Sequence, residues 1–339
     1  MQRKPTTRNF WLSGPSSAGR CMENGPPLLQ STGGKMAMLL RLSGPSMNWM
    51  SAQKIPNRRR LDKSSQGAVN MRLGVIGGTG LINMDLTKRI ADVGGEVIRT
   101  DDVHVDTPYG QVPLRCFSLS IGGAMHELVF LQRHHSSSGH GCPPHMINHK
   151  ANMTAMSQSN VDAILSVCSV GAIASSFTPG KVALAEQYID FTGVATTFHD
   201  DESTFTSATV PFDETMNSML EAILRDAQHF DSQEIMRYTY WLTQGPQFET
   251  VAEVDAIERL GGDMVGMTMP REAKLSCELS LPYAAVCISS NWAAGRDPAD
   301  ATKALDHEDV SAQANDRLEP VWSCIFSILD EAKHQGLLG

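Results

Sequence analysis

Five histidines, one cysteine and one arginine are crowded into residues 133–149 of this 339-residue sequence. Imidazole and thiolate groups are preferred zinc ligands, so a metal site is the first chemistry to consider. The spacing matches neither an HExxH pair nor a CxxC half-site, which disfavours zinc. Arg133 and His134 follow an apolar run, 128–132, that is typical of a buried strand. Ligands bind at strand ends in α/β sheets, and a guanidinium there can hold phosphate in a bidentate way.

A second candidate for anion binding is the loop Gly77-Gly-Thr-Gly80, which ends the apolar run 72–77. Glycines let backbone N–H groups approach an anion closely. The loop fails the dinucleotide fingerprint, because Asn83 occupies the third glycine position, and it lacks the Gly-Lys-Ser/Thr of a P-loop. Taken alone, it is as compatible with a structural turn as with phosphate binding.

Covalent catalysis has little support in the sequence. There is no Gly-x-Ser-x-Gly motif, and Cys168 lies in an apolar strand, where a small core residue is expected. In the C-terminal half, Glu249 opens a predicted helix and can simply compensate the helix dipole. Met267, taken alone, is expected to pack in the core.

Alternating strands and helices must position these residues. Short apolar runs predict strands at 72–77, 128–132, 163–167, 181–185, 236–242 and 283–290. Apolar spacing of i, i+3 and i+4 predicts helices at 216–229, 250–260, 272–279 and 307–332. This alternation indicates an α/β fold around a largely buried sheet.

The net charge of −9 conceals two parts of opposite sign. Residues 1–70 hold 11 of the 28 Lys and Arg but only two of the 37 Asp and Glu, so their net charge is +9 and that of 71–339 is −18. So acidic a body is a poor general nucleic-acid binder, because that affinity comes from neutralising phosphates. No apolar run is long enough to predict a membrane span. Seven scattered cysteines without a CxxC pair indicate a reducing compartment, the cytoplasm.

Residues 1–70 are expected to lie outside the fold. They are rich in Ser, Pro, Gly and Arg, lack a sustained period, and cannot bury enough apolar surface to offset their ordering entropy. Their composition is typical of a transit peptide, but Met71 leads straight into a strand, which favours an upstream extension from a misplaced start. We therefore expect a disordered basic extension over 1–70 and one domain over 71–339. Arg58-Arg59-Arg60 could contact RNA, although solvated disorder is favoured.

Six stretches together resemble the family of purine nucleoside phosphorylases and methylthioadenosine phosphorylases. They are 75–81 (VIGGTGL), 106–110 (DTPYG), 132–134 (QRH), 143–152 (PPHMINHKAN), 245–253 (GPQFETVAE) and 265–268 (VGMT). The resemblance implies a single-domain α/β fold with a central twisted mixed sheet flanked by helices, assembled as a homotrimer. It also implies phosphorolysis without cofactor or metal, in which inorganic phosphate attacks C1′ of a purine nucleoside and releases the base and ribose 1-phosphate.

The resemblance also implies where phosphate binds. Thr79, Arg133, His134 and Thr268 fall on the phosphate-binding positions of the family, and Ser169 falls where a backbone N–H contributes. A phosphate dianion held beneath the sugar stabilises the positive charge of an oxocarbenium-like transition state.

The same resemblance implies a nucleoside subsite. Phe248 falls on the position that packs against the base, Met267 on the ribose contact, and Glu249 and Asn291 on the purine-recognition positions. We assign Asn291 the catalytic task of donating near purine N7, because electron density moves into the departing base. His307 resembles the histidine that meets the 5′-hydroxyl in ordinary purine nucleoside phosphorylases.

Substrate choice within the family depends on the polar groups facing the purine. Asn291 and Ala293 stand where methylthioadenosine enzymes usually carry aspartates. An amide can donate or accept as a 6-oxopurine requires, and Glu249 can accept from N1–H. Residues 244–252 and 293–295 also look like bacterial methylthioinosine phosphorylases.

We therefore expect inosine, guanosine or S-methyl-5′-thioinosine as substrate. The alternatives are S-methyl-5′-thioadenosine phosphorolysis and a catalytically weak, phosphorylase-like scaffold. His135, Cys168 and Pro270-Arg271 depart from the family pattern and are expected either to reshape the phosphate loop or to reduce activity.

Overall fold

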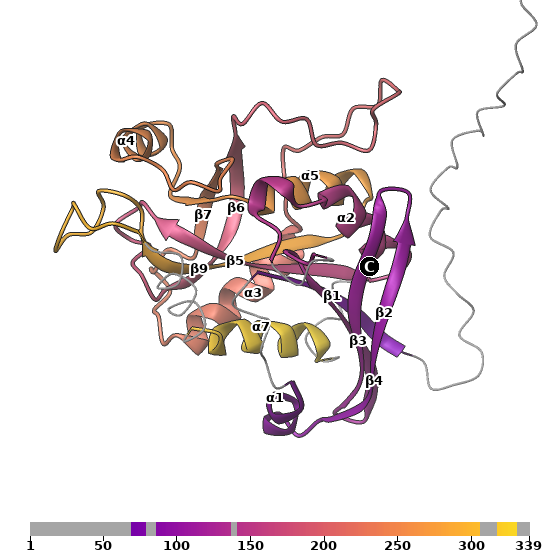
Figure 1. The fold of residues 1–339 in the computed structure, drawn as a ribbon. Coiled ribbons are helices and arrows are strands. Elements are labelled where there is room, and N and C mark those ends of the chain that lie inside the picture. Colours follow the sequence, from indigo (N-terminus) through magenta and orange to yellow (C-terminus); the bar gives the residue numbers. More distant parts are fainter. Residues whose placement is uncertain (1–68, 79–85, 137–140, 306–316, 331–339) are drawn as a thin grey trace, which may run out of the picture. The chain divides into compact units, whose positions relative to one another are not determined.

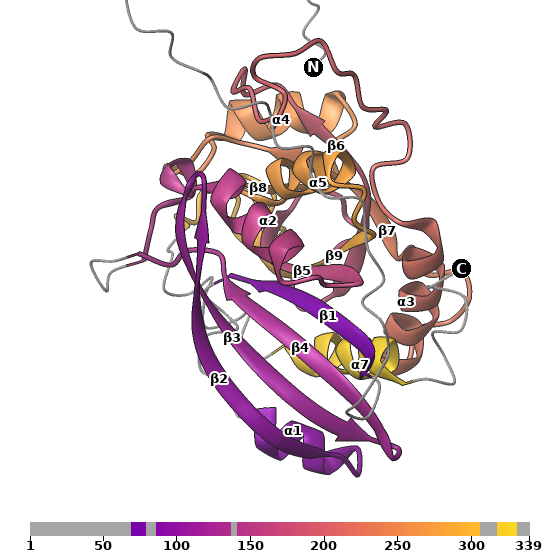
Figure 2. The same cartoon turned by 90° about the vertical axis from the view of Figure 1, so that its right-hand side faces the viewer.

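A nine-stranded mixed sheet carries the fold (Figures 1 and 2). Its strands run in the order β2-β3-β4-β1-β5-β8-β7-β6-β9, and β9 also pairs with β5. Strands β5, β8, β7, β6 and β9 therefore form a closed ring, from which β1, β4, β3 and β2 extend. The bounds are β1 (Val69–Gly77), β2 (Glu96–Thr107), β3 (Gly110–Ile121), β4 (Ala124–Gln132), β5 (Ala163–Ala172), β6 (Val182–Asp190), β7 (Arg237–Leu242), β8 (Met264–Gly266) and β9 (Tyr283–Trp292).

This computed structural model describes residues 69–78, 86–136, 141–305 and 317–330, all within one unit, 62–339. Strand β1 begins at Val69, two residues before the expected domain start at Met71. The remainder of the expected extension lies outside the described residues, as do the candidate site residues Thr79 and His307.

Helices cover the sheet on both faces (Figure 1). Helices α2 and α5 pack together on one side of β5 and β9, while α3 and α7 pack together on the other. None of the helices in the described ranges is long and apolar enough to cross a membrane. The bounds are α1 (Leu86–Asp92), α2 (His149–Gln158), α3 (Glu214–Ala227), α4 (Val251–Arg259), α5 (Met269–Glu278) and α7 (Glu319–Leu329).

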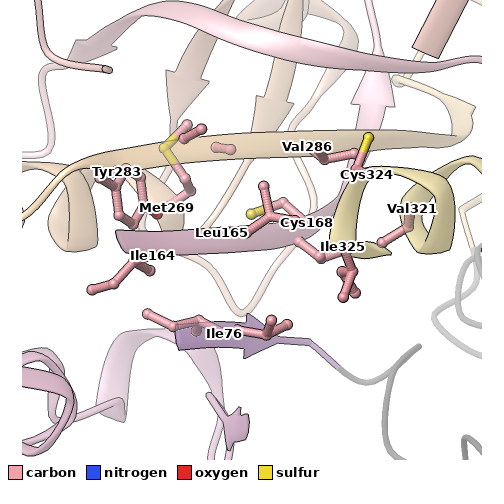
Figure 3. Close-up of a cluster of buried hydrophobic side chains, with 14 of the residues drawn as sticks. Ile76, Ile164, Leu165, Cys168, Met269, Tyr283, Val286, Val321, Cys324 and Ile325 are labelled. Atoms are coloured by element: carbon pink, nitrogen blue, oxygen red, sulfur yellow. The ribbon is translucent and has the colours of Figure 1, made fainter. Parts of the chain in front are cut away.

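The central strands are buried on both faces, which explains their continuous apolar sequences. All residues from Ala163 to Cys168 in β5 are buried. Leu165 of β5, Val286 of β9 and Ile325 of α7 lie in one cluster (Figure 3), which holds the sheet against the α3–α7 layer. The expected α/β class and mixed sheet are confirmed.

The long hairpin of β2 and β3 was not predicted from the sequence. Strand β2 is exposed or half-buried along its whole length and carries many charged residues, so it has no apolar signal. Antiparallel pairing with β3 over eleven residue pairs stabilises it instead, with cross-strand ion pairs such as Arg115–Asp102.

The expected helices are present with shifted ends. Helix α5 begins at Met269, three residues earlier than predicted, and Thr268 occupies its N-cap position. The helix expected over 307–332 begins at Glu319 in the described part, since residues 317 and 318 are not helical.

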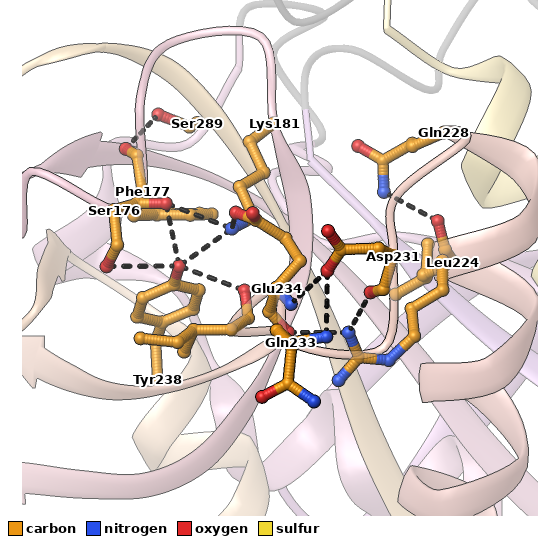
Figure 4. A network of polar contacts seen from close by, with 12 residues as sticks. Ser176, Phe177, Lys181, Leu224, Gln228, Asp231, Gln233, Glu234, Tyr238 and Ser289 are labelled. Atoms are coloured by element: carbon orange, nitrogen blue, oxygen red, sulfur yellow. Dashed lines mark hydrogen bonds and ion pairs between the residues drawn. The ribbon is translucent and has the colours of Figure 1, made fainter.

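A buried lysine ties together two loops at the β6 end of the sheet (Figure 4). Lys181 Nζ donates to the Ser176 carbonyl and to the Tyr238 hydroxyl, each at 2.9 Å, and forms an ion pair with Glu234. The ammonium also lies 5.3 Å from the ring centroids of Phe230 and Tyr238. With its charge and donors satisfied, Lys181 stabilises the fold away from the candidate site.

Replacing Lys181 by Met is expected to lower the free energy of unfolding by about 1–3 kcal/mol, because several buried acceptors lose their donor. Urea unfolding measures this. Arg115→Met is the matched control: its ion pair with Asp102 is more than half exposed, and its loss should change stability by less than about 1 kcal/mol. Equal losses in the two variants would contradict the assignment of Lys181 as a structural tie.

Candidate active site

Arg133 and the glycine-rich loop meet at the carboxyl ends of two parallel neighbours. Strands β1 and β4 pair with Gly77 opposite Gln132, and the Arg133 N–H donates to the Gly77 carbonyl at 2.9 Å. Gly78 lies against the guanidinium: a Cβ at this position would stand 3.4 Å from Arg133 Nη1. The structure thus brings two of the anion-binding candidates together.

The guanidinium of Arg133 is buried and largely occupied by the protein itself. Its Nε and Nη2 both bond the carboxylate of Glu272, Nη2 also donates to Ser166 Oγ at 2.6 Å, and Nη1 donates to the Val167 carbonyl at 3.1 Å. Glu272 takes the Nε/Nη2 face that could have held phosphate in a bidentate way, and the assignment of Arg133 to phosphate binding stays a prediction. One hydrogen of Nη1, the nitrogen facing Gly78, remains without a partner among the described residues.

Glu272 is the centre of this cluster, and sequence reasoning missed it. Besides Arg133, its Oε2 accepts from Ser166 Oγ and from the Tyr283 hydroxyl, each at 2.9 Å. Burial alone would raise the pKa of Glu272, but the charge and hydrogen bonds of Arg133 outweigh it and hold the pKa below its usual value. Glu272 is thus an ionised carboxylate in a buried position.

The loop after Arg133 is held by its own side chains. His134 Nδ1 lies 2.7 Å from the Cys142 carbonyl, and His135 Nε2 lies 2.8 Å from Asn152 Oδ1. Asn152 in turn donates to the Arg133 carbonyl at 3.3 Å. His135, a departure from the family pattern, therefore links the residue after His134 to α2.

A second departure, Cys168, lies in the same cluster. Cys168 Sγ is 3.6 Å from Arg133 Nη2, so this thiol packs on the guanidinium. Ser169 follows it in β5, is half-buried, and its hydroxyl bonds no described residue. Thr268 is buried at the N-cap of α5, yet its side chain makes no capping hydrogen bond. Its hydroxyl is therefore available beside the positive end of the α5 dipole.

A tyrosine fixes the chain just before Thr268. The Thr268 backbone N–H donates to the Tyr240 hydroxyl, and this hydroxyl lies so close to Gly266 that any Cβ there would collide with it. Strand β8 runs antiparallel to β5, with Val265 opposite Gly171, so the residues after Gly266 lead back along β5 towards Ser169. Because a Cβ would collide with the Tyr240 hydroxyl, only glycine fits at position 266.

The nucleoside candidates gather around Met267. Gly245 has a φ of +63°, and a Cβ there would lie 2.5 Å from Met267 Sδ, so the loop 244–249 rests on this side chain. Glu249 Oε1 accepts from Thr243 Oγ1 at 2.6 Å, and the Thr243 N–H donates to the Gly266 carbonyl at 2.9 Å. Burial raises the pKa of Glu249, and the Thr243 hydrogen bond only partly offsets this.

Phe248 and Asn291 complete this side of the site. Both are half-buried. Asn291 lies opposite Gly171 in the β5–β9 ladder, and Gly171 is also opposite Val265, so β8 and β9 end beside the same residue. Asn291 Oδ1 accepts from Ser290 Oγ at 2.8 Å, and Nδ2 donates to the Trp292 carbonyl at 2.7 Å. One amide hydrogen and one oxygen lone pair remain for a ligand.

His149 is a buried histidine whose two ring nitrogens bond no described residue. It begins α2, where α2 packs against α5, and it feels the charges of Glu272, Arg271 and Arg133. Desolvation lowers its pKa to about 4, against the opposing effect of Glu272. The ring is therefore neutral at pH 7. In the sequence this residue was only one member of the histidine-rich segment.

The four described histidines of that segment do not converge on one point, and His140 lies outside the described residues. His134, His135 and His149 have the separate surroundings given above, and His145 is exposed. Across the described ranges, no group of three or more His, Cys, Asp or Glu residues is placed to hold a metal ion.

Acid should destabilise the protein through His149. The unfolded side chain takes up a proton near pH 6.5 and the folded one only near pH 4, so its contribution is full above pH 6.5 and is lost as the pH falls. Between pH 7 and pH 5 this amounts to about 2 kcal/mol. Urea unfolding at both pH values should show a smaller acid loss in His149→Phe than in the wild type. Replacing the exposed His145 by Phe is the control; an unchanged acid loss in His149→Phe would contradict the prediction.

Comparison with known proteins places this site in a family. Residues 72–323 match the Phosphorylase superfamily. The chain is similar to a probable S-methyl-5′-thioinosine phosphorylase of Methanothermobacter thermautotrophicus, at 32% identity over 76% of this chain and 85% of the relative. It is also similar to a 6-oxopurine nucleoside phosphorylase of Pyrococcus furiosus, at 33% identity over 76% of this chain and 92% of the relative.

Solved structures share the fold. A methylthioadenosine phosphorylase from an Antarctic soil metagenomic library has a TM-score of 0.64 at 24% identity, covering 80% of this chain and 91% of its own. The methylthioadenosine phosphorylase of Schistosoma mansoni in complex with adenine has a TM-score of 0.63 at 22% identity, covering 76% and 90%. At these identities the likeness concerns the fold alone. The family resemblance inferred from the sequence is confirmed, and the chain belongs to the Phosphorylase superfamily.

Proposed function

We propose that this chain catalyses the phosphorolysis of 6-oxopurine nucleosides. Phosphate attacks C1′, the C1′–N9 bond breaks, and the products are the free base and a ribose 1-phosphate. The candidate substrates are inosine, guanosine and S-methyl-5′-thioinosine, with inorganic phosphate as co-substrate and no cofactor. The named relatives at 32% and 33% identity support this class.

One observation carries the proposal: Met267, in the proposed nucleoside subsite, is followed directly in the chain by Thr268, in the proposed phosphate subsite. Met267 packs against Gly245 in the loop that holds Phe248 and Glu249. Thr268, the next residue, caps the helix whose first turn bonds Arg133 through Glu272. An anion at Thr268 and a nucleoside over Met267 would therefore be neighbours, as an in-line displacement requires.

On the phosphate side, the donors are fixed before the substrate arrives. Buried partners orient the Arg133 guanidinium, and the start of α5 positions the unbonded Thr268 hydroxyl, so these donors need little reorganisation in the transition state. Thr79, His134 and Ser169 are proposed as further phosphate ligands. The bound anion stabilises the positive charge that develops on the sugar.

On the purine side, Glu249 and Asn291 are proposed to read the base, with Phe248 packing against it and Met267 beneath the ribose. In its carboxylate form Glu249 can accept from N1–H of a 6-oxopurine, and the remaining Asn291 amide hydrogen stabilises the departing purine at N7. His307 is proposed to meet the 5′-hydroxyl.

We extend the proposal to the assembly. The segment between β6 and α3 carries four exposed apolar side chains, with Phe205 94% and Phe191 74% exposed, together with Val194 and Val210. Exposed apolar groups gathered on one segment mark interaction surfaces. They support association of the 71–339 domain with further copies of itself. That the assembly is a homotrimer and that it is cytoplasmic are proposed from the family resemblance and the cysteine pattern of the sequence.

S-methyl-5′-thioadenosine phosphorolysis is the alternative. The methylthioadenosine phosphorylases among the solved structures share the fold at 24% identity or less, which does not favour that substrate. Asn291 and the acidic Glu249 favour a 6-oxopurine.

The purified chain is expected to release hypoxanthine from inosine or S-methyl-5′-thioinosine only when phosphate is present, as measured by coupled oxidation of the base. Adenosine and S-methyl-5′-thioadenosine serve as comparison substrates. Faster turnover of the 6-amino nucleosides would favour the alternative, and a folded chain inactive on all four would support a non-catalytic scaffold.

Asn291→Asp is expected to shift preference towards 6-aminopurines, because a carboxyl group suits the 6-amino group and N7 of adenine. The ratio of kcat/KM for adenosine to that for inosine should rise about tenfold, the effect of one mismatched polar contact. The control is Asn160→Asp, which adds the same charge at an exposed position after α2. An unchanged ratio in Asn291→Asp would overturn the recognition model.

A further inference from the structure

Two adjacent charged residues in the first turn of α5 have entirely different partners. Arg271 donates from Nη2 to Gln244 Oε1 at 2.9 Å and from Nη1 to the Met267 carbonyl at 3.3 Å. Glu272 bonds Arg133, Ser166 and Tyr283. One residue therefore faces the proposed nucleoside loops and the other faces the proposed phosphate donors.

The surroundings of Arg271 are unusual for a structural arginine. The residue is only 4% exposed, its Nε has no partner among the described residues, and no carboxylate in those ranges forms an ion pair with it. The nearby Asp190 is already bonded to Lys274 and Thr192. Burial lowers the pKa of Arg271, an effect that Asp190 only partly opposes. Burying a guanidinium with an unbonded nitrogen opposes folding, so Arg271 is expected to have a role in the site other than stabilising the fold.

The hydrogen bonds of Arg271 indicate this role. Gln244 begins the loop that leads to Phe248 and Glu249, and the Met267 carbonyl belongs to the proposed ribose contact. A single rigid side chain thereby fixes the separation of the β7 and β8 loop ends.

Glu272 fixes the position of a side chain on the proposed phosphate side, that of Arg133. It holds Arg133 by two bonds and is held in turn by Ser166 and Tyr283, so the guanidinium has one orientation. Without this carboxylate, Arg133 would be an uncompensated buried charge, free to turn away from Gly78.

We propose that Arg271 and Glu272 are positioning residues with separate tasks: Arg271 orients the loops that bind the nucleoside, and Glu272 orients Arg133 towards phosphate. This inference rests on the proposed function and adds to it residues that touch neither substrate. It predicts that substitutions at these two neighbouring positions raise KM for different substrates, the nucleoside for Arg271 and phosphate for Glu272.

The test compares Arg271→Met with Glu272→Gln by steady-state phosphorolysis. Arg271→Met removes the donors but keeps the length, and it should raise KM for the nucleoside about tenfold, equivalent to about 1.4 kcal/mol. Its KM for phosphate should stay within about twofold. Glu272→Gln should raise KM for phosphate about tenfold and leave KM for the nucleoside within about twofold. Arg271→Lys, which can still reach one of the two acceptors, should recover part of the nucleoside affinity.

Ser276→Ala is the matched control, because it removes a buried hydrogen bond to the Leu281 carbonyl from the last turn of the same helix. It should change both KM values equally or not at all. Parallel increases in both KM values for Arg271→Met and Glu272→Gln would overturn the inference, as would no change in either. If Glu272→Gln does not fold, Tyr283→Phe removes one hydrogen bond from Glu272 and should raise KM for phosphate in the same direction.

Calorimetric titration with inorganic phosphate separates this inference from the proposed function. A wild type that binds phosphate but cleaves no purine nucleoside would overturn the function alone. In that case weaker phosphate binding by Glu272→Gln, with unchanged binding by Arg271→Met, would still support the positioning roles. A wild type that binds no phosphate would overturn both.

Discussion

The ion pair between Arg133 and Glu272 is the constraint on which the candidate site depends. Both side chains are almost completely buried, and removing two charges from water is costly unless further hydrogen bonds satisfy most of their donors and acceptors. Ser166, Val167 and Tyr283 supply the remaining contacts. The pair therefore fixes the end of β4, the middle of β5, the start of β9 and the first turn of α5 relative to one another.

This constraint changes how an anion would be recognised. Glu272 cancels most of the positive charge of Arg133, within a body, 71–339, whose net charge is −18. Attraction by net charge cannot be the source of affinity. In the proposed site, oriented donors would replace it: one Nη1 hydrogen, the Thr268 hydroxyl and the N-terminus of α5 would act at hydrogen-bond distance, whereas distant charges are screened by salt.

Local patterns predicted much of the fold, and contacts between distant segments supplied what they missed. The apolar runs at 72–77 and 283–290 predicted β1 and β9, because strands buried on both faces are apolar throughout. Strand β2 escaped prediction since its stability comes from β3. Arg133 was a candidate from its place after a strand, but Glu272 lies 139 residues away. No local spacing could reveal that their charges meet.

The sequence 269–272 shows how such distant pairing limits local inference. The arginine beside Pro270 departs from the family pattern, and the sequence alone predicts that it reshapes the phosphate loop or reduces activity. In an α-helix, neighbouring side chains point about 100° apart, so Arg271 and Glu272 cannot serve the same half of the site. Glu272 takes the phosphate side because only a carboxylate compensates Arg133, and the helix geometry then turns Arg271 towards Gln244 and Met267. On the proposed assignment of the site, the departure therefore bears on the nucleoside loops, a consequence that follows from the buried ion pair.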